Sequence, residues 1–322
     1  MTDAKLILAG SSIGMIKRVS LRGDAPLYGR KSLTLEVASL EPQALVEWFP
    51  SKTPEEVMAI YGIFGGTPAH LEHVDESPSA MENVHRVMPS KGGALYDEPE
   101  FLIMQEVRSP GAYMDIMGAI SAGRQTISEI ADHTRIPREN LPKYIASLIT
   151  MRLVIREVTR PRGKVSHILA DPFLQFWFRF VWANRNLLEA GLNHVVWDEV
   201  ERELGAHLGR VFEGVAMGYI TRLIHEGRLK LSPNYVGRWV DRDIEIDIVA
   251  TAKQEELAYA FEVKWRPLTL REAQSVLGNL ENKALSIRAK TKVYGLIAKS
   301  VEHKERLQDA GYQVYTLEEI FS

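Results

Sequence analysis

The sequence predicts a mixed α/β protein of several domains, in which a mainly helical N-terminal part precedes an α/β domain with a mixed central sheet. Three observations lead to this fold class. From residue 41 to about residue 110, apolar side chains recur at helical spacing between turns rich in glycine and proline. Residues 111–171 show three helical segments followed by a hairpin pattern. Residues 206–322 alternate helical with extended segments, as α/β domains do.

The composition is that of an ordinary globular protein, with 45% hydrophobic and 25% charged residues over 322 positions. A net charge of −3 creates no overall attraction to nucleic acid or membrane, so any such affinity has to come from local clusters. No cysteine is present, which excludes disulfides and thiolate metal sites and suits a reducing cytoplasm. The start lacks a signal-peptide pattern, and the apolar segment 173–183 is too short to span a bilayer. We therefore expect a soluble cytoplasmic protein with no membrane partner.

Two extended segments, at 6–10 and 32–40, precede the helical region. Because two strands alone do not make a stable sheet, residues 1–40 are expected to be the remnant of an α/β core whose beginning is absent. Residues 41–110 then form a helical unit that is punctuated by the turn-rich "GGTP" at 65–68.

Residues 111–171 read as a compact unit of a different kind. The second of its three helices begins with Thr126 and Glu129 at capping-box spacing, and the third is expected from residue 138 onward. The segments "VIREVT" and "VSHILA", joined by the turn "RPRGK", complete a hairpin. Three helices followed by a hairpin are typical of a winged helix–turn–helix. Residues 172–205 continue as an aromatic-rich helical connector.

A basic cluster coincides with the predicted winged unit. Between residues 135 and 164 there are eight basic and two acidic side chains, a local net charge of +6 in a chain of net charge −3. In a winged helix the start of the third helix enters the major groove and the tip of the hairpin lies against phosphate. The predicted DNA contacts are Arg135, Arg138, Asn140, Lys143, Arg160, Arg162 and Lys164. The alternative is a winged helix that docks onto another protein.

Charged side chains interrupt two apolar segments near the C-terminus. Asp247 stands between two isoleucines, while Glu262 and Lys264 alternate with apolar residues in "FEVKW". Because side chains alternate across a strand, Glu262 and Lys264 share a face, and pairing of the two strands would bring Asp247 beside them. Two buried carboxylates require a cation or protonation, and hard oxygen ligands suit Mg²⁺ or Mn²⁺. With Lys264 to orient water or offset developing charge, the site suits phosphodiester hydrolysis. The alternative is an edge strand with a solvated ion pair.

This stretch resembles the PD-(D/E)XK nuclease superfamily, whose restriction-endonuclease-like core runs helix–strand–strand–strand–helix–strand. In that resemblance "EID" supplies Asp247, "EVK" supplies Glu262 and Lys264, and the preceding helix offers Glu213. It implies Asp247 and Glu262 as metal ligands, Glu213 as an outer ligand and Lys264 as the catalytic lysine. Gln274 occupies the place of a glutamine that some members carry. The proline that often precedes the aspartate is missing here.

The whole chain resembles archaeal P-loop ATPases of the AAA-like, signal-transducing kind. The segment "LILAGSS" is similar to their sensor strand, and "YGIFGGTPAHL", with Gly66 and Pro68, is similar to their helical lid; a winged helix and an endonuclease-like domain follow in many members. No G-x-x-x-x-G-K-[ST] motif occurs, so we expect no ATP binding or hydrolysis by this chain alone. Arg30 and the lid could serve a partner that carries a P-loop, or the chain could self-associate.

Three hypotheses follow from these patterns. The first is a DNA-associated protein with a DNA-binding winged helix at 111–171 and a metal-dependent nuclease-like domain at 206–322. The second is a non-catalytic DNA-binding or scaffolding regulator with an inert endonuclease-like domain. The third is a fragment of an archaeal ATPase whose ATP site lies in the missing P-loop half.

Overall fold

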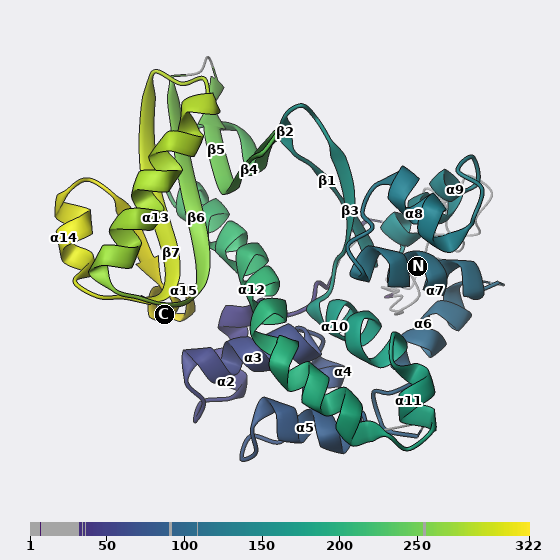
Figure 1. Cartoon of the computed structure of the whole chain (residues 1–322). Helices are drawn as coiled ribbons and strands as arrows, with labels where there is room; N and C mark the ends of the chain where they lie inside the picture. Colours follow the sequence, from purple (N-terminus) through teal and green to yellow (C-terminus); the bar gives the residue numbers. More distant parts are fainter. Residues whose placement is uncertain are drawn as a thin grey trace, which may run out of the picture.

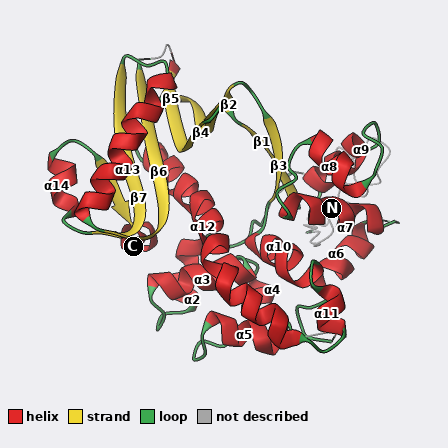
Figure 2. Ribbon diagram, viewed as in Figure 1, coloured by secondary structure: helices red, strands yellow, loops and turns green. Residues whose placement is uncertain are grey.

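The computed structural model describes residues 7, 32–33, 35, 37–89, 92–107, 109–253 and 256–322. Figures 1 and 2 show a mixed α/β protein in which a helical part and a strand-rich part are connected by the long helix α12 (Asn193–His225). The predicted fold class, a mixed α/β chain that is mainly helical at its start, is confirmed at this level. Among the described residues, no helix has the length and apolarity needed to cross a membrane.

The two strands predicted near the N-terminus are not observed in the described residues. The strand expected at 6–10 lies outside them, apart from residue 7. For 32–40 the prediction is wrong where the structure describes it, because residues 37–40 belong to no helix or strand. The described apolar side chains of this segment, Leu33, Leu35 and Val37, are each at least 80% exposed, so no sheet buries them.

Leu40 is instead held by a loop contact with Gly66. The backbone N–H of Leu40 donates to the carbonyl oxygen of Gly66 at 2.8 Å. A Cβ atom on residue 66 would lie 1.9 Å from the carbonyl oxygen of Leu40, so only glycine permits this approach. The "GGTP" turn is therefore a contact point between two backbone segments.

The helical unit predicted at 41–110 consists of short helices with clear start signals. Thr53 and Glu56 form a capping box at the start of α3, which ends at Phe64 and is followed by Gly65 with a positive φ of 70°. Ser79 and Glu82 form a second capping box. The elements are η1 (Pro42–Ala44), α2 (Leu45–Trp48), α3 (Pro54–Phe64), α4 (Pro68–Leu71), α5 (Ala80–Val87) and α6 (Glu98–Glu106).

Residues 111–171 contain the three helices and the hairpin that were predicted there. The elements are α7 (Gly111–Ser121), α8 (Ile127–Thr134), α9 (Leu141–Thr150), β1 (Val154–Val158) and β3 (Val165–Leu169), with β1 antiparallel to β3. The capping box of Thr126 and Glu129 is present at the start of α8. The third helix is shorter than predicted because Pro142 lies in its first turn, where the lack of an N–H is tolerated; further inside the helix it would break a hydrogen bond.

The connector contains α10 (Pro172–Phe176), the π-helical segment η2 (Trp177–Trp182) and α11 (Arg185–Glu189). Its aromatic side chains are buried except for the half-buried Trp182, and the indole N–H of Trp177 donates to the carbonyl oxygen of Tyr96 at 2.8 Å. Helix α12 passes without a break through the boundary placed between residues 205 and 206. One rigid helix therefore belongs to both parts of the chain.

The C-terminal part is built around a mixed six-stranded sheet of order β2-β4-β5-β6-β7-β8. Strands β4, β5 and β6 are antiparallel neighbours, whereas β7 and β8 continue the sheet in parallel with β6. Its elements are β4 (Pro233–Asp241), β5 (Ile244–Ala252), β6 (Leu257–Leu268), α13 (Leu270–Lys283), η4 (Ala284–Ser286), β7 (Thr291–Val301), α14 (Lys304–Asp309), β8 (Gln313–Thr316) and α15 (Leu317–Phe321).

Helices α12 and α13 cover opposite faces of this sheet. Phe261 on β6 belongs to the core that contains Phe212 of α12. Ala260, its neighbour in sequence, belongs to the core that contains Leu277 and Leu280 of α13. Because side chains of successive strand residues point to opposite faces, the two helices sandwich the sheet (Figure 1).

The sixth strand of the sheet comes from the hairpin at 154–169. Strand β2 (Arg160–Pro161), at the hairpin tip, pairs in parallel with β4 through Arg160–Trp239 and Pro161–Val240. Figure 1 shows the hairpin extending from the helical part to the edge of the sheet. This contact covers an edge strand that would otherwise expose unpaired backbone groups.

Candidate functional site

Asp247 lies where strands β5 and β6 separate. Their backbone pairing reaches Ile248–Phe261 and goes no further toward Asp247. One residue beyond, the Asp247 carboxylate oxygen Oδ2 accepts a hydrogen bond from the backbone N–H of Val263 at 2.8 Å. The side chain thus takes the place of a backbone acceptor and is fixed between the two strands.

Lys264 joins the two predicted carboxylates. Its Nζ donates to Glu262 Oε2 at 2.7 Å and lies 3.6 Å from Asp247 Oδ2. Glu262 Oε2 and Asp247 Oδ2 are therefore separated by no more than 6.3 Å, the sum of these two distances. The structure brings Asp247, Glu262 and Lys264 together in one group, here called the carboxylate–lysine cluster.

The surroundings of this cluster disfavour the ionised form of Asp247 and favour the protonated form of Lys264. Burial, and then the neighbouring charge of Glu262, raise the pKa of Asp247. Burial acts to lower the pKa of Lys264, but its hydrogen bond to Glu262 and the charge of Asp247 outweigh burial and raise that pKa. Lys264 therefore remains protonated at neutral pH.

A second lysine, which the sequence analysis missed, also contacts Glu262. Lys283, at the C-terminal end of α13, donates from Nζ to Glu262 Oε1 at 2.7 Å. The Glu262 side chain is only 6% exposed, and both of its oxygens are paired with an ammonium. In sequence Lys283 looks like a basic residue that complements the helix dipole, so nothing distinguishes it before the fold is known. Gln274, on the same helix, is exposed and makes no hydrogen bond to this cluster within the described chain.

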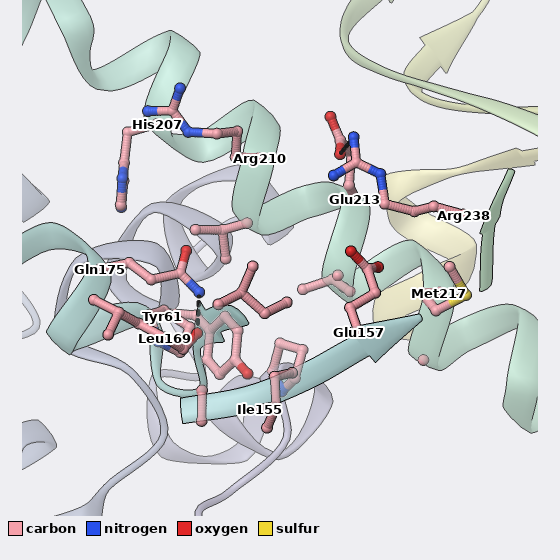
Figure 3. Close-up of a pocket in the computed structure, with 18 of the residues that line it drawn as sticks. Tyr61, Ile155, Glu157, Leu169, Gln175, His207, Arg210, Glu213, Met217 and Arg238 are labelled. Carbon is pink, nitrogen blue, oxygen red and sulfur yellow. Dashed lines mark hydrogen bonds and ion pairs between the residues drawn. The ribbon is translucent and has the colours of Figure 1, made fainter. Parts of the chain in front are cut away.

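Glu213 occupies a neighbouring but separate position. Its Oε2 lies 3.6 Å from Nη2 of Arg238 on β4, and Arg238 also pairs with Glu245. Burial raises the pKa of Glu213 to about 7, against the opposing charge of Arg238. Figure 3 shows Glu213 and Arg238 side by side at one end of a cavity. Arg238 was missed although it carries the signal that revealed Asp247, a charge within an apolar strand.

Asp247 and Glu262 are the oxygen donors that the cluster offers to a divalent cation. Across the described residues, no three His, Asp or Glu side chains form a group arranged to hold a metal ion. Two carboxylates nevertheless suffice for Mg²⁺ or Mn²⁺ when water and substrate phosphate complete the ligands. The raised pKa of Asp247 shows that negative charge is disfavoured there, and a cation would relieve it. Asp247 and Glu262 thus fit such an ion, which would compete with the lysines for Glu262.

The predicted DNA-contact residues lie at two distinct places. Arg135, Arg138 and Lys143 are exposed at the end of α8 and the start of α9, with Asn140 half-buried among them. Arg138 and Asn140 precede α9 because this helix begins only at Leu141. The hairpin tip lies away from α9, at the edge of the sheet (Figure 1).

Arg160 and Arg162, at the hairpin tip, already have partners in β4. Arg162 Nε pairs with Asp241 Oδ1 at 2.8 Å. The Arg160 guanidinium lies 4.8 Å from the centre of the Tyr235 ring. In this arrangement the two arginines bind the C-terminal sheet, whereas Lys164 beside them is exposed.

A cavity of about 760 Å³ separates α12 from the hairpin. Its wall is formed by α12, β1, β3, β4 and parts of the helical unit, and both Asp247 and Glu213 line it. In Figure 3, Tyr61, Gln175 and His207 lie at one end, while Glu213, Arg238 and Glu157 lie at the other. The carboxylate–lysine cluster therefore borders this cavity through Asp247.

These features define a mixed α/β protein with a carboxylate–lysine cluster beside a cavity, and comparisons with known proteins place it among relatives. The family described as "Archaea bacterial proteins of unknown function" (DUF234) matches residues 177–276, an interval that contains Glu213, Asp247, Glu262 and Lys264. The "Uncharacterized protein MJECL04" of Methanocaldococcus jannaschii is 30% identical over 312 residues, which are 94% of this chain and 70% of that protein. The chain belongs to the family of this archaeal protein. No solved structure matches it significantly.

Proposed function

We propose that the C-terminal α/β part hydrolyses phosphodiester bonds with Mg²⁺ or Mn²⁺, in a protein that associates with DNA. The observation that carries this proposal is the position of Lys264 Nζ, 2.7 Å from Glu262 and 3.6 Å from Asp247. The order α12-β4-β5-β6-α13-β7 also follows the helix–strand–strand–strand–helix–strand order of PD-(D/E)XK nucleases. This order of elements supports the proposal.

The residues of the cluster have separable roles in such a reaction. Asp247 and Glu262 would hold the ion, which supplies Lewis-acid polarisation of the phosphoryl group when bound. Lys264, kept protonated by its carboxylate neighbours, is suited to donate hydrogen bonds to an oxygen on which negative charge develops. Glu213 has a pKa of about 7, which suits a group that accepts a proton from attacking water.

Association with DNA is proposed for the exposed basic surface of α8 and α9. Arg135, Arg138 and Lys143 are exposed there, and the segment from 135 to 164 carries a net charge of +6. In a winged helix this surface contacts the major groove and the flanking phosphates. The match of three helices and a hairpin to that motif supports the proposal.

A plasmid-nicking assay tests the proposed hydrolysis. Wild-type protein is expected to nick supercoiled DNA with Mg²⁺ or Mn²⁺ and to lose this activity in EDTA. Asp247→Asn should abolish nicking, because it removes one of the two charged oxygen donors. Asp243→Asn is the matched control, because Asp243 is an exposed aspartate in the turn that precedes the same strand. Nicking that survives Asp247→Asn would assign the activity to another site or to a contaminant.

A second function, that of a non-catalytic DNA-binding or scaffolding regulator, is favoured by one observation. Lys264 and Lys283 together satisfy both oxygens of Glu262, so its charge is compensated without a metal. This alternative predicts salt-dependent binding of DNA without cleavage. It also predicts an unchanged melting temperature on addition of Mn²⁺, whereas a metal that binds the native state raises it.

A further inference from the structure

The cavity beside Asp247 has features that the proposed hydrolysis alone does not explain. Its volume of about 760 Å³ falls in the range of pockets that hold one small ligand. It is bounded by α12 on one side and by the hairpin strands β1 and β3 on the other (Figure 3). Any substrate that reaches Asp247 from this side has to pass through that space.

One face of α12 forms a long wall of the cavity. Arg210, Gly214, Gly218 and Arg222 follow one another at four-residue intervals, and all four line it. The two arginines are separated by about 18 Å along the helix axis, given a rise of 1.5 Å per residue. A Cβ atom added at Gly214 or Gly218 would meet no atom within 4 Å. Glycine weakens a helix, so these two positions leave open space at a cost in stability.

The charges at this wall favour a ligand with several phosphates. Arg210 is exposed, and its guanidinium has no partner among the described residues. Arg222 lies at the other end of the glycine pair, with its guanidinium 5.3 Å from the centre of the Tyr219 ring and Nη2 donating to the carbonyl oxygen of Ile320 at 3.3 Å. Among the described residues no carboxylate forms an ion pair with it. The carboxylates that also line the cavity are Glu41, which is exposed, and Glu157, Glu213 and Asp247, each with a pKa that burial raises in favour of its neutral form. Asp247 belongs to the cluster proposed to hold the cation.

The size of the cavity excludes a duplex. A cavity of this volume that extends for about 18 Å along α12 averages about 6–7 Å across, whereas the major groove of B-DNA alone is about 12 Å wide. An unpaired strand is narrow enough, and its backbone can lie over a helix face that lacks side chains.

We infer that this cavity binds an unpaired nucleic-acid strand, with phosphates at Arg210 and Arg222 and the backbone passing over Gly214 and Gly218 toward Asp247. The inference rests on the proposed function, because it names the substrate class of the same site. It predicts faster cleavage at single-stranded ends, gaps or flaps than within relaxed duplex, and it assigns the nicks in supercoiled plasmid to regions where the two strands are unpaired.

The test measures binding without catalysis. Fluorescence anisotropy in EDTA compares a labelled single-stranded oligonucleotide with a blunt hairpin duplex that has the same number of phosphates. Wild-type protein should bind the single strand at this site, whereas duplex binding is assigned to the basic surface of α8 and α9, so the variants below are compared on both nucleic acids. Arg210→Gln should weaken that binding severalfold and reduce the slope of log K against log salt by about one phosphate contact, while Arg306→Gln on the distant α14 should change neither.

A pair of glycine substitutions separates loss of the cavity from loss of the fold. Gly218→Leu should fill the cavity and weaken single-strand binding at least about tenfold, without lowering the melting temperature. Gly278→Leu is the matched control, because Gly278 lies on α13, outside the cavity, and its added Cβ also meets nothing within 4 Å. It should bind like wild type.

The outcomes distinguish this inference from the proposed hydrolysis. Loss of single-strand binding in Gly218→Leu, with duplex binding unchanged, supports the inference even if no nicking occurs with Mn²⁺. Normal single-strand binding by a folded Gly218→Leu protein overturns the inference even if nicking is observed.

Discussion

The contribution of Lys264 can be isolated by comparing it with Lys283. Each lysine places Nζ 2.7 Å from one oxygen of Glu262, but only Lys264 also approaches Asp247, at 3.6 Å. Replacing either by methionine keeps most of the aliphatic side chain and removes the charge. The difference between the two variants therefore measures what an ammonium between two carboxylates contributes.

The structure sets the expected magnitudes. Breaking a fully buried ion pair costs about 3–5 kcal/mol. Lys264 is 33% exposed, and Lys283 continues to neutralise Glu262 in its absence, so we expect Lys264→Met to lower the free energy of unfolding by about 1–2 kcal/mol at neutral pH. Lys283 is 38% exposed and contacts one carboxylate, so Lys283→Met should cost about 0.2–1 kcal/mol.

Activity should separate the two variants more widely than stability. Removing a donor that stabilises developing charge costs about 100-fold to 1000-fold in rate, which is the expectation for Lys264→Met in the nicking assay. Lys283→Met should lose less than about tenfold, because its ammonium pairs with Glu262 and not with Asp247. Urea denaturation and initial nicking rates measure the two effects on the same protein samples.

The destabilisation caused by Lys264→Met should depend on pH in a defined direction. The folded-state pKa of Asp247 is raised, so its contribution to stability is greatest when the carboxyl is protonated and is lost as the pH rises through that pKa. In Lys264→Met the ionised Asp247 lacks its ammonium neighbour, and the destabilisation should therefore be smaller at about pH 5 than at about pH 8. A larger cost at the lower pH, or equal loss of activity in both lysine variants, would refute this account of the cluster.

Three further predictions concern single positions. Asp247→Asn keeps an oxygen for the Val263 N–H but removes a charge that burial disfavours, so at about pH 8 its melting temperature should equal or exceed that of wild type while nicking is lost. Glu213 has a pKa raised to about 7, so its contribution to wild-type stability should fall as the pH rises from about 4.5 to 7. In thermal scans Glu213→Gln should match wild type at about pH 4.5 and become increasingly more stable than wild type as the pH rises through this range. Gly66→Ala should lower stability by about 1–3 kcal/mol in urea denaturation, because its Cβ would meet the Leu40 carbonyl oxygen at 1.9 Å; an unchanged midpoint would contradict that contact.

Local signals in the sequence predicted most of the helices and strands. Capping-box spacing at Thr126 and Glu129 placed the start of α8, and hairpin chemistry placed the turn between β1 and β3. The same reasoning failed at 32–40, where an alternating apolar pattern suggested a strand. That pattern states which side chains could be buried, but the described side chains of this segment have no sheet to cover them.

The candidate site was partly predictable for a similar reason. Asp247, Glu262 and Lys264 were found because charge inside an apolar strand is costly and requires a partner. Lys283 was not found, because its contact with Glu262 depends on how α13 packs across the sheet. The docking of the hairpin tip on β4 was also missed, since Arg160 and Arg162 look the same in sequence whether they face phosphate or Asp241.

By itself the sequence determined the elements, the mixed α/β class and the charges that need compensation, because propensity, capping and alternation act over a few neighbouring residues. Tertiary structure decided which distant groups meet. It decided that β5 and β6 separate at Asp247, that the Lys283 ammonium also contacts Glu262, and that a cavity lies between α12 and the hairpin. These features depend on packing between segments far apart in the chain, and no local pattern encodes the geometry of that packing.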